Sequence, residues 1–458
     1  METVHADLLV IGFGKGGKTL AAAMGRQGRR VVMVEQSDQM YGGTCINIGC
    51  VPTKALIHRA SARPRDADPR AWYEESVAWT ASLTTLLRGK NFAMLDSLDS
   101  VTVITGTAAF LDEKRVAVTA GADRLEITAD TIVVNTGAEP VVPDVPGLRD
   151  SKHLVTGTEL IAGPDLPRRT AVIGGGYQGI EFAAMLARYG AEVTVLEKGE
   201  RILPREDADV AAAAEEILRA EGVRFVTGAR VIEVTDDEDK AFVRYEVDGV
   251  TATAEADAVL AAAGRRPRTG ELNLAAAGVR TTATGAIEVD EHLRTSRPHI
   301  FAIGDVNGGP QFTYISLDDY RIVADQLTGA GKRSTADRAA VPYVLFMTPP
   351  LARVGLTEDE ARAAGRPVRV AAKPIAAIAA MPRARIVGDT RGLMKFVIDA
   401  ETDAVLGAAL LSVDAQELIN TVALAIRAGV TATELRDAIW THPSSTEAFN
   451  EVLATIVR

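Results

Sequence analysis

The chain has 458 residues, of which 47% are hydrophobic and 24% are charged, and its formal net charge is −11. Such a composition is typical of globular domains rather than disordered chains, and the length predicts about three domains. The acidic balance argues against nucleic acid or an anionic membrane surface as a partner. Apolar stretches stay shorter than the roughly 18 residues that span a bilayer, and the acidic N-terminus does not resemble a signal peptide. We therefore expect a cytoplasmic protein that binds neither nucleic acid nor membranes.

A glycine-rich turn near the N-terminus stands between a predicted strand and a predicted helix. The apolar run 8–11 precedes the turn, and an Ala-rich helical stretch at 18–27 follows it. The glycines of the turn follow the spacing G-x-G-x-x-G: Gly12, Gly14 and Gly17. Such a turn lets a pyrophosphate approach the N-terminus of the helix, where free N–H groups and the helix dipole favour an anion. A second apolar run, 31–34, ends in Glu35, which is placed to accept hydrogen bonds from a ribose diol.

The same pattern recurs farther along the chain. The apolar run 171–173 precedes the turn, a helix is predicted at 180–189, and the next apolar run ends in Glu197. The glycines of this turn repeat the spacing: Gly174, Gly176 and Gly179. Two copies predict that one chain binds two dinucleotides, and the simplest chemical reason is hydride transfer from a nicotinamide to a flavin. The carboxylate of Glu197 suits a ribose 2′-hydroxyl better than a 2′-phosphate, so NADH is favoured over NADPH, although Lys198 and Arg201 lie nearby.

The chain has two cysteines, Cys45 and Cys50, and six histidines. Two cysteines cannot form the framework of a secreted disulfide scaffold, and the histidines lack the clustered spacing of a structural zinc site. Taken alone, the pair could be two buried structural thiols or a redox couple. Its position after the first glycine-rich unit, and directly before Val51-Pro52-Thr53-Lys54, favours the redox couple.

The chain resembles the pyridine nucleotide–disulfide oxidoreductases over almost its whole length. Besides the two glycine-rich units and the cysteine pair, the resemblance rests on four further segments: Asn135-Thr136-Gly137, Gly264-Arg265-Arg266-Pro267, Gly304-Asp305, and His442-Pro443 with Glu447. It implies an α/β fold with two Rossmann-like dinucleotide-binding domains and a C-terminal α+β dimerisation domain. The implied boundaries are an FAD-binding domain at 1–150, an NAD(P)H-binding domain at 151–270, a return segment of the FAD-binding domain at 271–340 and a dimerisation domain at 341–458. In the last domain we expect strands at 392–398 and 405–412 and an amphipathic helix at 415–429.

The resemblance also implies cofactors and residue roles. FAD would be bound, and NADH or NADPH would be the electron donor. Cys50 would contact the flavin, and Cys45 would meet the substrate. Lys54 and Glu181 match an ion pair beside the flavin N5, and Tyr177 matches a gate that covers the flavin until nicotinamide displaces it. Beyond the glycines and acids of the two units, the implied cofactor-binding residues are Gly43, Thr44, Lys54, Ala108, Thr136, Gly137, Gly264, Arg265, Asp305, Gln311, Phe312 and Thr313.

A last pair of implied catalytic residues lies near the C-terminus. In the family, a His-Pro step followed by a glutamate forms an acid–base dyad, which His442 and Glu447 match. The carboxylate would orient the imidazole so that it exchanges protons with Cys45. Because this dyad reaches the dithiol of the opposite subunit in the family, the resemblance implies a homodimer with a shared active site.

Further residues limit the range of possible electron acceptors. The segment 311–320 resembles the branch of the family associated with bacterial resistance to reactive chlorine, which implies Cu(II) or a hypothiocyanous acid-type species as the small oxidant. The lack of a third cysteine argues against mercuric reductases and large thioredoxin reductases. Trp440, Tyr314 and Pro350 replace residues typical of dihydrolipoamide dehydrogenase, so that enzyme, or a reductase of small disulfides, remains an alternative, as does a non-catalytic flavin sensor. The sequence assigns no metal ligands.

Overall fold

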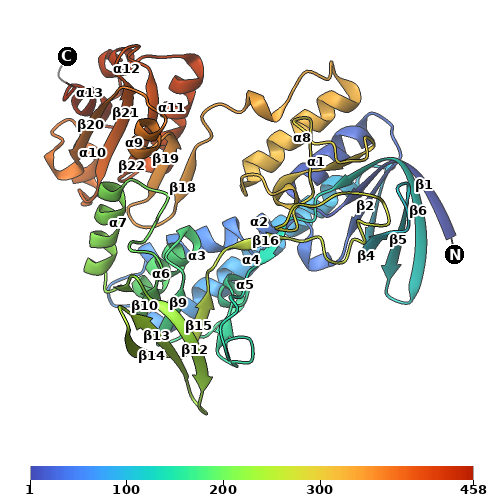
Figure 1. Cartoon of the computed structure of the whole chain (residues 1–458), viewed down its shortest axis with the longest axis horizontal. Coiled ribbons are helices and arrows are strands. Elements are labelled where there is room, and N and C mark those ends of the chain that lie inside the picture. The colour runs from blue at the N-terminus through green and yellow to red at the C-terminus, as the bar shows by residue number, and fades with distance from the viewer. Residues whose placement is uncertain (1, 457–458) are drawn as a thin grey trace.

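The computed structural model describes residues 2–456, and its first sheet has seven strands (Figure 1). The order is β3-β2-β1-β6-β5-β4, with β17 paired to β6. These strands are β1 (Glu2–Ile11), β2 (Val31–Glu35), β3 (Val101–Thr105), β4 (Thr107–Phe110), β5 (Arg115–Ala120), β6 (Asp123–Val134) and β17 (Ile300–Ala302). β1, β2, β3, β6 and β17 run parallel, so their carboxyl ends lie at one edge of the sheet.

Helices of this unit pack on the sheet and on one another, and α2 and α3 carry the cysteine pair. They are α1 (Lys15–Arg26), α2 (Thr44–Asn47), α3 (Cys50–Ser61), α4 (Pro69–Asp96) and α8 (Thr313–Thr328). α1 packs against α8, although the two helices are far apart in the sequence (Figure 1). α1 begins before the predicted residue 18, because Gly16 and Gly17 of the turn already have helical conformation.

The second unit is a parallel sheet of five strands in the order β11-β10-β9-β15-β8. Its elements are β8 (Leu154–Val155), α5 (Gly157–Ala162), β9 (Arg169–Ile173), α6 (Tyr177–Tyr189), β10 (Glu192–Leu196), α7 (Ala208–Ala220), β11 (Arg224–Val226) and β15 (Ala258–Ala261). An antiparallel sheet of β12 (Arg230–Asp236), β13 (Ala241–Val247) and β14 (Val250–Ala256) extends from it, and β7 (Ala138–Pro140) pairs with β16 (Arg265–Pro267) where the chain crosses between the two units. The structure thus has the two nucleotide-type α/β units that the sequence predicts.

The C-terminal unit is an antiparallel sheet in the order β18-β19-β22-β21-β20, which stands apart from the first sheet in Figure 1. Its elements are β18 (Tyr343–Leu345), β19 (Leu351–Gly355), α9 (Glu358–Ala363), β20 (Val368–Pro374), α10 (Pro382–Ile386), β21 (Leu393–Asp399), β22 (Val405–Leu411), α11 (Ala415–Ala428), α12 (Ala432–Asp437) and α13 (Ala448–Leu453). β21, β22 and α11 agree with the predicted elements within one residue. Within residues 2–456, no helix has both the length and the apolar character needed to cross a membrane.

One hydrophobic core joins the helices that carry the predicted redox residues. α3 and α4 pack on α6, and the rings of Tyr73 and Tyr189 meet edge to face with centroids 4.9 Å apart. The Tyr73 hydroxyl donates to the Leu160 carbonyl and the Tyr189 hydroxyl to the Leu56 carbonyl, each at 3.0 Å. Because both phenols are fully buried and hydrogen-bonded, they fix α3 against α6.

Candidate active site

A cavity of about 2230 Å³ is lined by both glycine-rich units and by the start of α11. It exceeds the roughly 300–1,000 Å³ of a pocket for one drug-sized ligand, so it has room for more than one large ligand. All the predicted site residues line the cavity except Gly17, Gly179, His442 and Glu447. Gly17 lies in α1 and Gly179 in α6, each in the first turn of its helix. His442 and Glu447 lie in the C-terminal unit.

The first glycine-rich turn is held open by a buried asparagine. Gly12 has φ +100°, and a Cβ there would lie 2.4 Å from the Asn135 carbonyl oxygen, so another side chain would not fit. The Asn135 side chain accepts from the Gly17 N–H at 2.9 Å and donates to the Ile303 carbonyl at 2.7 Å. It therefore joins the turn after β1 to the ends of β6 and β17, and keeps the N-terminus of α1 open to the cavity.

Acidic side chains beside this turn are placed for a dinucleotide. Glu35 is buried and accepts from the Phe13 N–H at 2.9 Å, and burial raises the pKa of its carboxyl. Burial also raises the pKa of Asp305, although Arg265 opposes the shift. Among residues 2–456, no other residue donates a hydrogen bond to the Asp305 carboxylate, which lines the cavity. An open helix N-terminus with one buried and one half-buried acid fits the pyrophosphate and hydroxyl groups of FAD.

The second turn repeats this geometry. Gly174 has φ +115°, and a Cβ there would lie 2.7 Å from the Ala262 carbonyl oxygen. The Glu197 carboxylate accepts from the N–H groups of Gly175 at 2.6 Å and Gly199 at 2.7 Å. Nearby Arg201 donates to the Glu206 backbone carbonyl at 3.0 Å, so it is tied to the chain rather than directed at a bound ribose.

The cysteine pair lies on the cavity wall. Cys45 is in the single turn of α2 and Cys50 begins α3, where Cys50 is exposed to the cavity. A hydrogen bond from the Cys45 thiol lowers the pKa of Cys50, and the Thr313 hydroxyl, 3.7 Å from its sulfur, and Lys54 lower it further. The same hydrogen bond, together with burial, raises the pKa of Cys45. When the dithiol loses its first proton, the negative charge therefore lies on Cys50. The thiolate, not the thiol, is the reactive form of a cysteine.

An ion pair spans α3 and α6 beside this pair. The Lys54 ammonium lies 2.7 Å from Glu181 Oε2, and Glu181 Oε1 accepts from the Phe346 N–H at 2.9 Å. The Lys54 ammonium lies over the Phe346 ring, 5.0 Å from the ring centroid. Because Glu181 is buried and both its oxygens are bound, the charge of Lys54 is held at a fixed position on the cavity wall.

The predicted gate residue belongs to a hydrogen-bonded group. The hydroxyls of Tyr177 and Tyr343 both donate to Glu206 Oε1, at 2.7 and 2.8 Å, and the two phenol oxygens lie 3.1 Å apart. Glu206 is buried, and its other oxygen lies 3.9 Å from the Arg353 guanidinium. Burial raises the pKa of both tyrosines, so the phenols stay protonated donors. Tyr177 is thereby restrained by Glu206 of its own unit and contacts Tyr343 on β18 of the C-terminal unit.

His442 and Glu447 form a pair outside the cavity. His442 Nδ1 lies 2.9 Å from Glu447 Oε2, and the Ser444 N–H donates to Glu447 Oε1 at 2.8 Å. Burial alone would raise the pKa of Glu447, but these two hydrogen bonds lower it. The His442 side chain is 71% exposed. The structure of one chain thus forms the dyad and does not bring it to Cys45.

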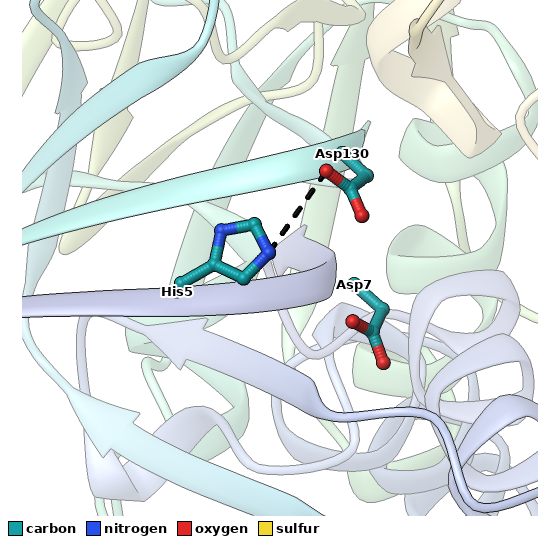
Figure 2. Close-up of side chains that lie close together, drawn as sticks. All are labelled: His5, Asp7 and Asp130. Carbon is teal, nitrogen blue, oxygen red and sulfur yellow. Dashed lines mark ion pairs between the residues drawn. The ribbon is translucent and has the colours of Figure 1, made fainter.

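Another cluster of possible ligands lies at the surface of the first sheet. Figure 2 shows His5 and Asp7 on β1 and Asp130 on β6, with the imidazole Nε2 3.9 Å from Asp130. Arg30 binds both oxygens of Asp7, from its guanidinium at 3.0 Å and its N–H at 2.8 Å. Only two of the three groups are therefore free to take a cation, fewer than a stable site provides.

Sequence reasoning missed three residues that hold the predicted ones in place: Asn135, Glu206 and Tyr343. Asn135 stands in the Asn-Thr-Gly segment on which the family resemblance partly rests, so its position gave a signal. Glu206 and Tyr343 come from separate segments and belong to no spaced motif, so only the fold brings them to Tyr177.

Two family profiles match most of the chain. The sequence profile described as pyridine nucleotide-disulphide oxidoreductase matches residues 6–319, and the profile of the dimerisation domain of that family matches residues 341–453. The chain belongs to this family. The predicted family, α/β fold class and enzyme class are confirmed: the protein is a flavoprotein disulfide reductase of an FAD-dependent family that binds pyridine nucleotides.

Three relatives place the chain within the family. An Escherichia coli protein, the probable pyridine nucleotide-disulfide oxidoreductase RclA, is 45% identical over 448 residues that cover 98% of each chain. A solved structure of the Cu(II) complex of that HOCl-induced flavoprotein disulfide reductase has a TM-score of 0.94 at 44% identity, covering 99% of this chain and 100% of the other. A dihydrolipoyl dehydrogenase of Geobacillus stearothermophilus is 34% identical and covers 96% of this chain and 94% of its own. The predicted branch is therefore also confirmed.

Proposed function

We propose that the enzyme passes electrons from NAD(P)H through FAD to the Cys45–Cys50 pair, and from there to a small oxidant. The observation that carries the proposal is the position of the pair on a cavity wall shared by both glycine-rich units, beside the fixed Lys54–Glu181 ion pair. FAD, when bound, would supply the transfer of electrons between nicotinamide and sulfur. We propose NADH as the preferred donor, since Glu197 is the acid beside the second turn and Arg201 is tied to the backbone.

Each proposed role follows from a contact in the cavity. The turn at Gly12 and Gly14, with Glu35 and Asp305, would hold FAD. Cys50, whose thiolate is favoured, would face the flavin, and Cys45 would attack the substrate. The residues of the second turn would hold the nicotinamide dinucleotide, with Tyr177 displaced when it binds.

The acceptor we favour is Cu(II) or a hypothiocyanous acid-type oxidant. Two Cu(II) ions would take one electron each as the dithiol closes to a disulfide and releases two protons, and the Cu(I) formed prefers soft thiolates. With hypothiocyanous acid, the Cys45 thiolate would attack the sulfur and expel hydroxide, and Cys50 would then displace thiocyanate to close the disulfide. The support is the likeness to RclA, for which a Cu(II) complex is known.

We also propose a homodimer in which His442 of a second copy completes the site. Two observations support this: the dimerisation-domain match, and the exposed His442–Glu447 pair that lies outside the cavity of its own chain. The domain boundaries at 150, 270 and 340 are part of the same proposal. We propose a cytoplasmic location, because a reducing compartment keeps a catalytic dithiol in use.

Replacement of Cys45 by serine tests the function. We expect C45S to bind FAD and to be reduced by NADH, but to lose turnover with every acceptor that needs the dithiol. Undiminished NADH-dependent reduction of Cu(II) and hypothiocyanous acid by this variant would reject the dithiol route.

Dihydrolipoamide dehydrogenase remains the second candidate, because a relative of that name covers almost the whole chain. Steady-state assays with lipoamide, glutathione disulfide, Cu(II) and hypothiocyanous acid separate the two. A kcat/KM for lipoamide that exceeds the others by orders of magnitude would overturn our ranking. A flavin that NADH fails to bleach would instead favour a non-catalytic sensor.

A further inference from the structure

A lysine without an acidic partner is buried behind the dithiol loop. Lys18, in α1, is 4% exposed, and its partners within residues 2–456 are a backbone carbonyl and an amide oxygen rather than a carboxylate. Its ammonium donates to the Gly42 carbonyl at 3.3 Å and to the Asn91 side-chain oxygen on α4. Lys18 does not line the cavity, whereas its neighbour Lys15 does. A buried lone ammonium costs stability, so such a residue is a candidate for a functional role.

The groups around Lys18 connect it to the attacking sulfur. Gly42 lies three residues before Cys45, and it is packed so closely that an added Cβ would lie 3.0 Å from Ile46 and 3.3 Å from Asn91. The loop therefore cannot move away from Lys18 without losing this packing. Lys18 and Cys45 also influence each other electrostatically: the ammonium favours the Cys45 thiolate, and the thiolate favours the ammonium.

The other charged groups near the pair act mainly on Cys50. The charge of Lys54 lowers the pKa of Cys50, and the charge of Glu181 raises it. The Cys50 thiolate in turn raises the pKa of Arg265 and of Tyr314. Lys15 is the remaining charged group that acts on Lys18 itself. The two sulfurs thus have separate lysines, Lys54 for Cys50 on the cavity wall and Lys18 for Cys45 behind the loop.

We propose that Lys18 is a positioning residue that stabilises the negative charge on Cys45 when the disulfide is reduced, and so makes Cys45 the attacking thiolate. The proposal rests on the proposed function of the pair. Reduction breaks the S–S bond, adds two electrons from the flavin and one proton, and leaves one thiol and one thiolate. Lys54 holds the charge on Cys50 at first, and Lys18 lowers the cost of moving it to Cys45 for attack.

The charge of Lys18 can be removed while its hydrogen bonds are kept. We expect K18Q, which retains an N–H donor toward Gly42, to slow the iodoacetamide alkylation of Cys45 about tenfold over the part of the pH profile below about pH 7.5, where Lys18 still carries its charge. K18R should keep the wild-type profile. K114Q, which removes a surface charge from the β4–β5 turn, is the matched control.

A second variant covers the case in which K18Q does not fold. N91D places a carboxylate against the ammonium and cancels its charge without removing it, so we expect the same slower alkylation of Cys45 below about pH 7.5. The measurement uses holoenzyme reduced with a phosphine, with each cysteine followed by its own peptide. Profiles for both variants that match the wild type would overturn the inference.

Reduction by NADH separates this inference from the proposed function. If NADH reduces the pair in the wild type and the Cys45 profile does not respond to N91D or K18Q, only the role of Lys18 fails. If the profile shifts as expected but NADH does not reduce the pair, the proposed function fails and the coupling of Lys18 to Cys45 stands.

Discussion

Replacement of Asn135 by leucine tests whether the first glycine-rich turn is held by one side chain. Leucine has a similar shape and removes both hydrogen bonds, leaving the Gly17 N–H and the Ile303 carbonyl buried without their partner. Each unsatisfied group costs about 1–3 kcal/mol, so the substitution should cost about 2–6 kcal/mol. If about 2 kcal/mol of this cost opposes the turn conformation that binds FAD, the affinity for FAD decreases by about 30-fold.

The assay is a fluorescence titration of apo-protein with FAD, together with thermal unfolding of the holoenzyme. N450L is the control, because Asn450 donates to the carbonyls of Arg436 and Ala438 in the C-terminal unit, far from the turn. We expect N450L to unfold at a lower temperature with unchanged FAD affinity. An N135L enzyme that binds FAD as the wild type does would refute the reasoning.

Three further predictions concern the gate, the dyad and the buried lysine. Y177F removes the hydrogen bond that holds the ring on Glu206. Because such a bond contributes about 0.5–1.5 kcal/mol, NADH should bind several-fold more tightly in a stopped-flow titration, and an unchanged Kd contradicts the restraint. H442Q should lower turnover by roughly 10²–10⁴-fold and leave flavin reduction by NADH intact, whereas slow flavin reduction would place His442 elsewhere in the cycle. Burial lowers the pKa of Lys18 in the folded protein to about 8, whereas the unfolded chain keeps a value of about 10.4. Between these two pH values the unfolded chain binds more protons than the folded one, so the free energy of unfolding rises with pH by up to about 3 kcal/mol. The melting temperature of wild type relative to K18M should therefore rise between pH 7 and 10, and a constant difference contradicts the shift.

Local patterns were enough to predict the two nucleotide-type units and the glycines and acids of their turns. Strand, glycine turn, helix and acid lie within one short segment, so the spacing of Gly12 and Glu35, and of Gly174 and Glu197, specifies each unit without knowledge of the rest. The resemblance then supplied Asp305, which is far away in the sequence but follows a strand of the same sheet.

The contacts that orient the site could not be predicted in this way. The buried side chain of Glu206 accepts from Tyr177 of its own unit and from Tyr343, which β18 of the C-terminal unit brings to the same carboxylate. Lys18 stands at an ordinary helix position, and only the packing of α1 against α4 and the dithiol loop shows that its charge is buried. Such residues depend on how separate segments pack, which no local spacing records.

The central claim is that Cys45 and Cys50 receive the electrons that NADH delivers to the flavin. Anaerobic titration of holoenzyme with one equivalent of NADH, followed by alkylation and peptide mapping, tests it directly. We predict that both cysteines change from unreactive to alkylated, that the flavin stays oxidised, and that long-wavelength absorbance appears in the wild type but not in C50S. A flavin that bleaches completely at one equivalent, with the cysteines still unreactive, would contradict the account.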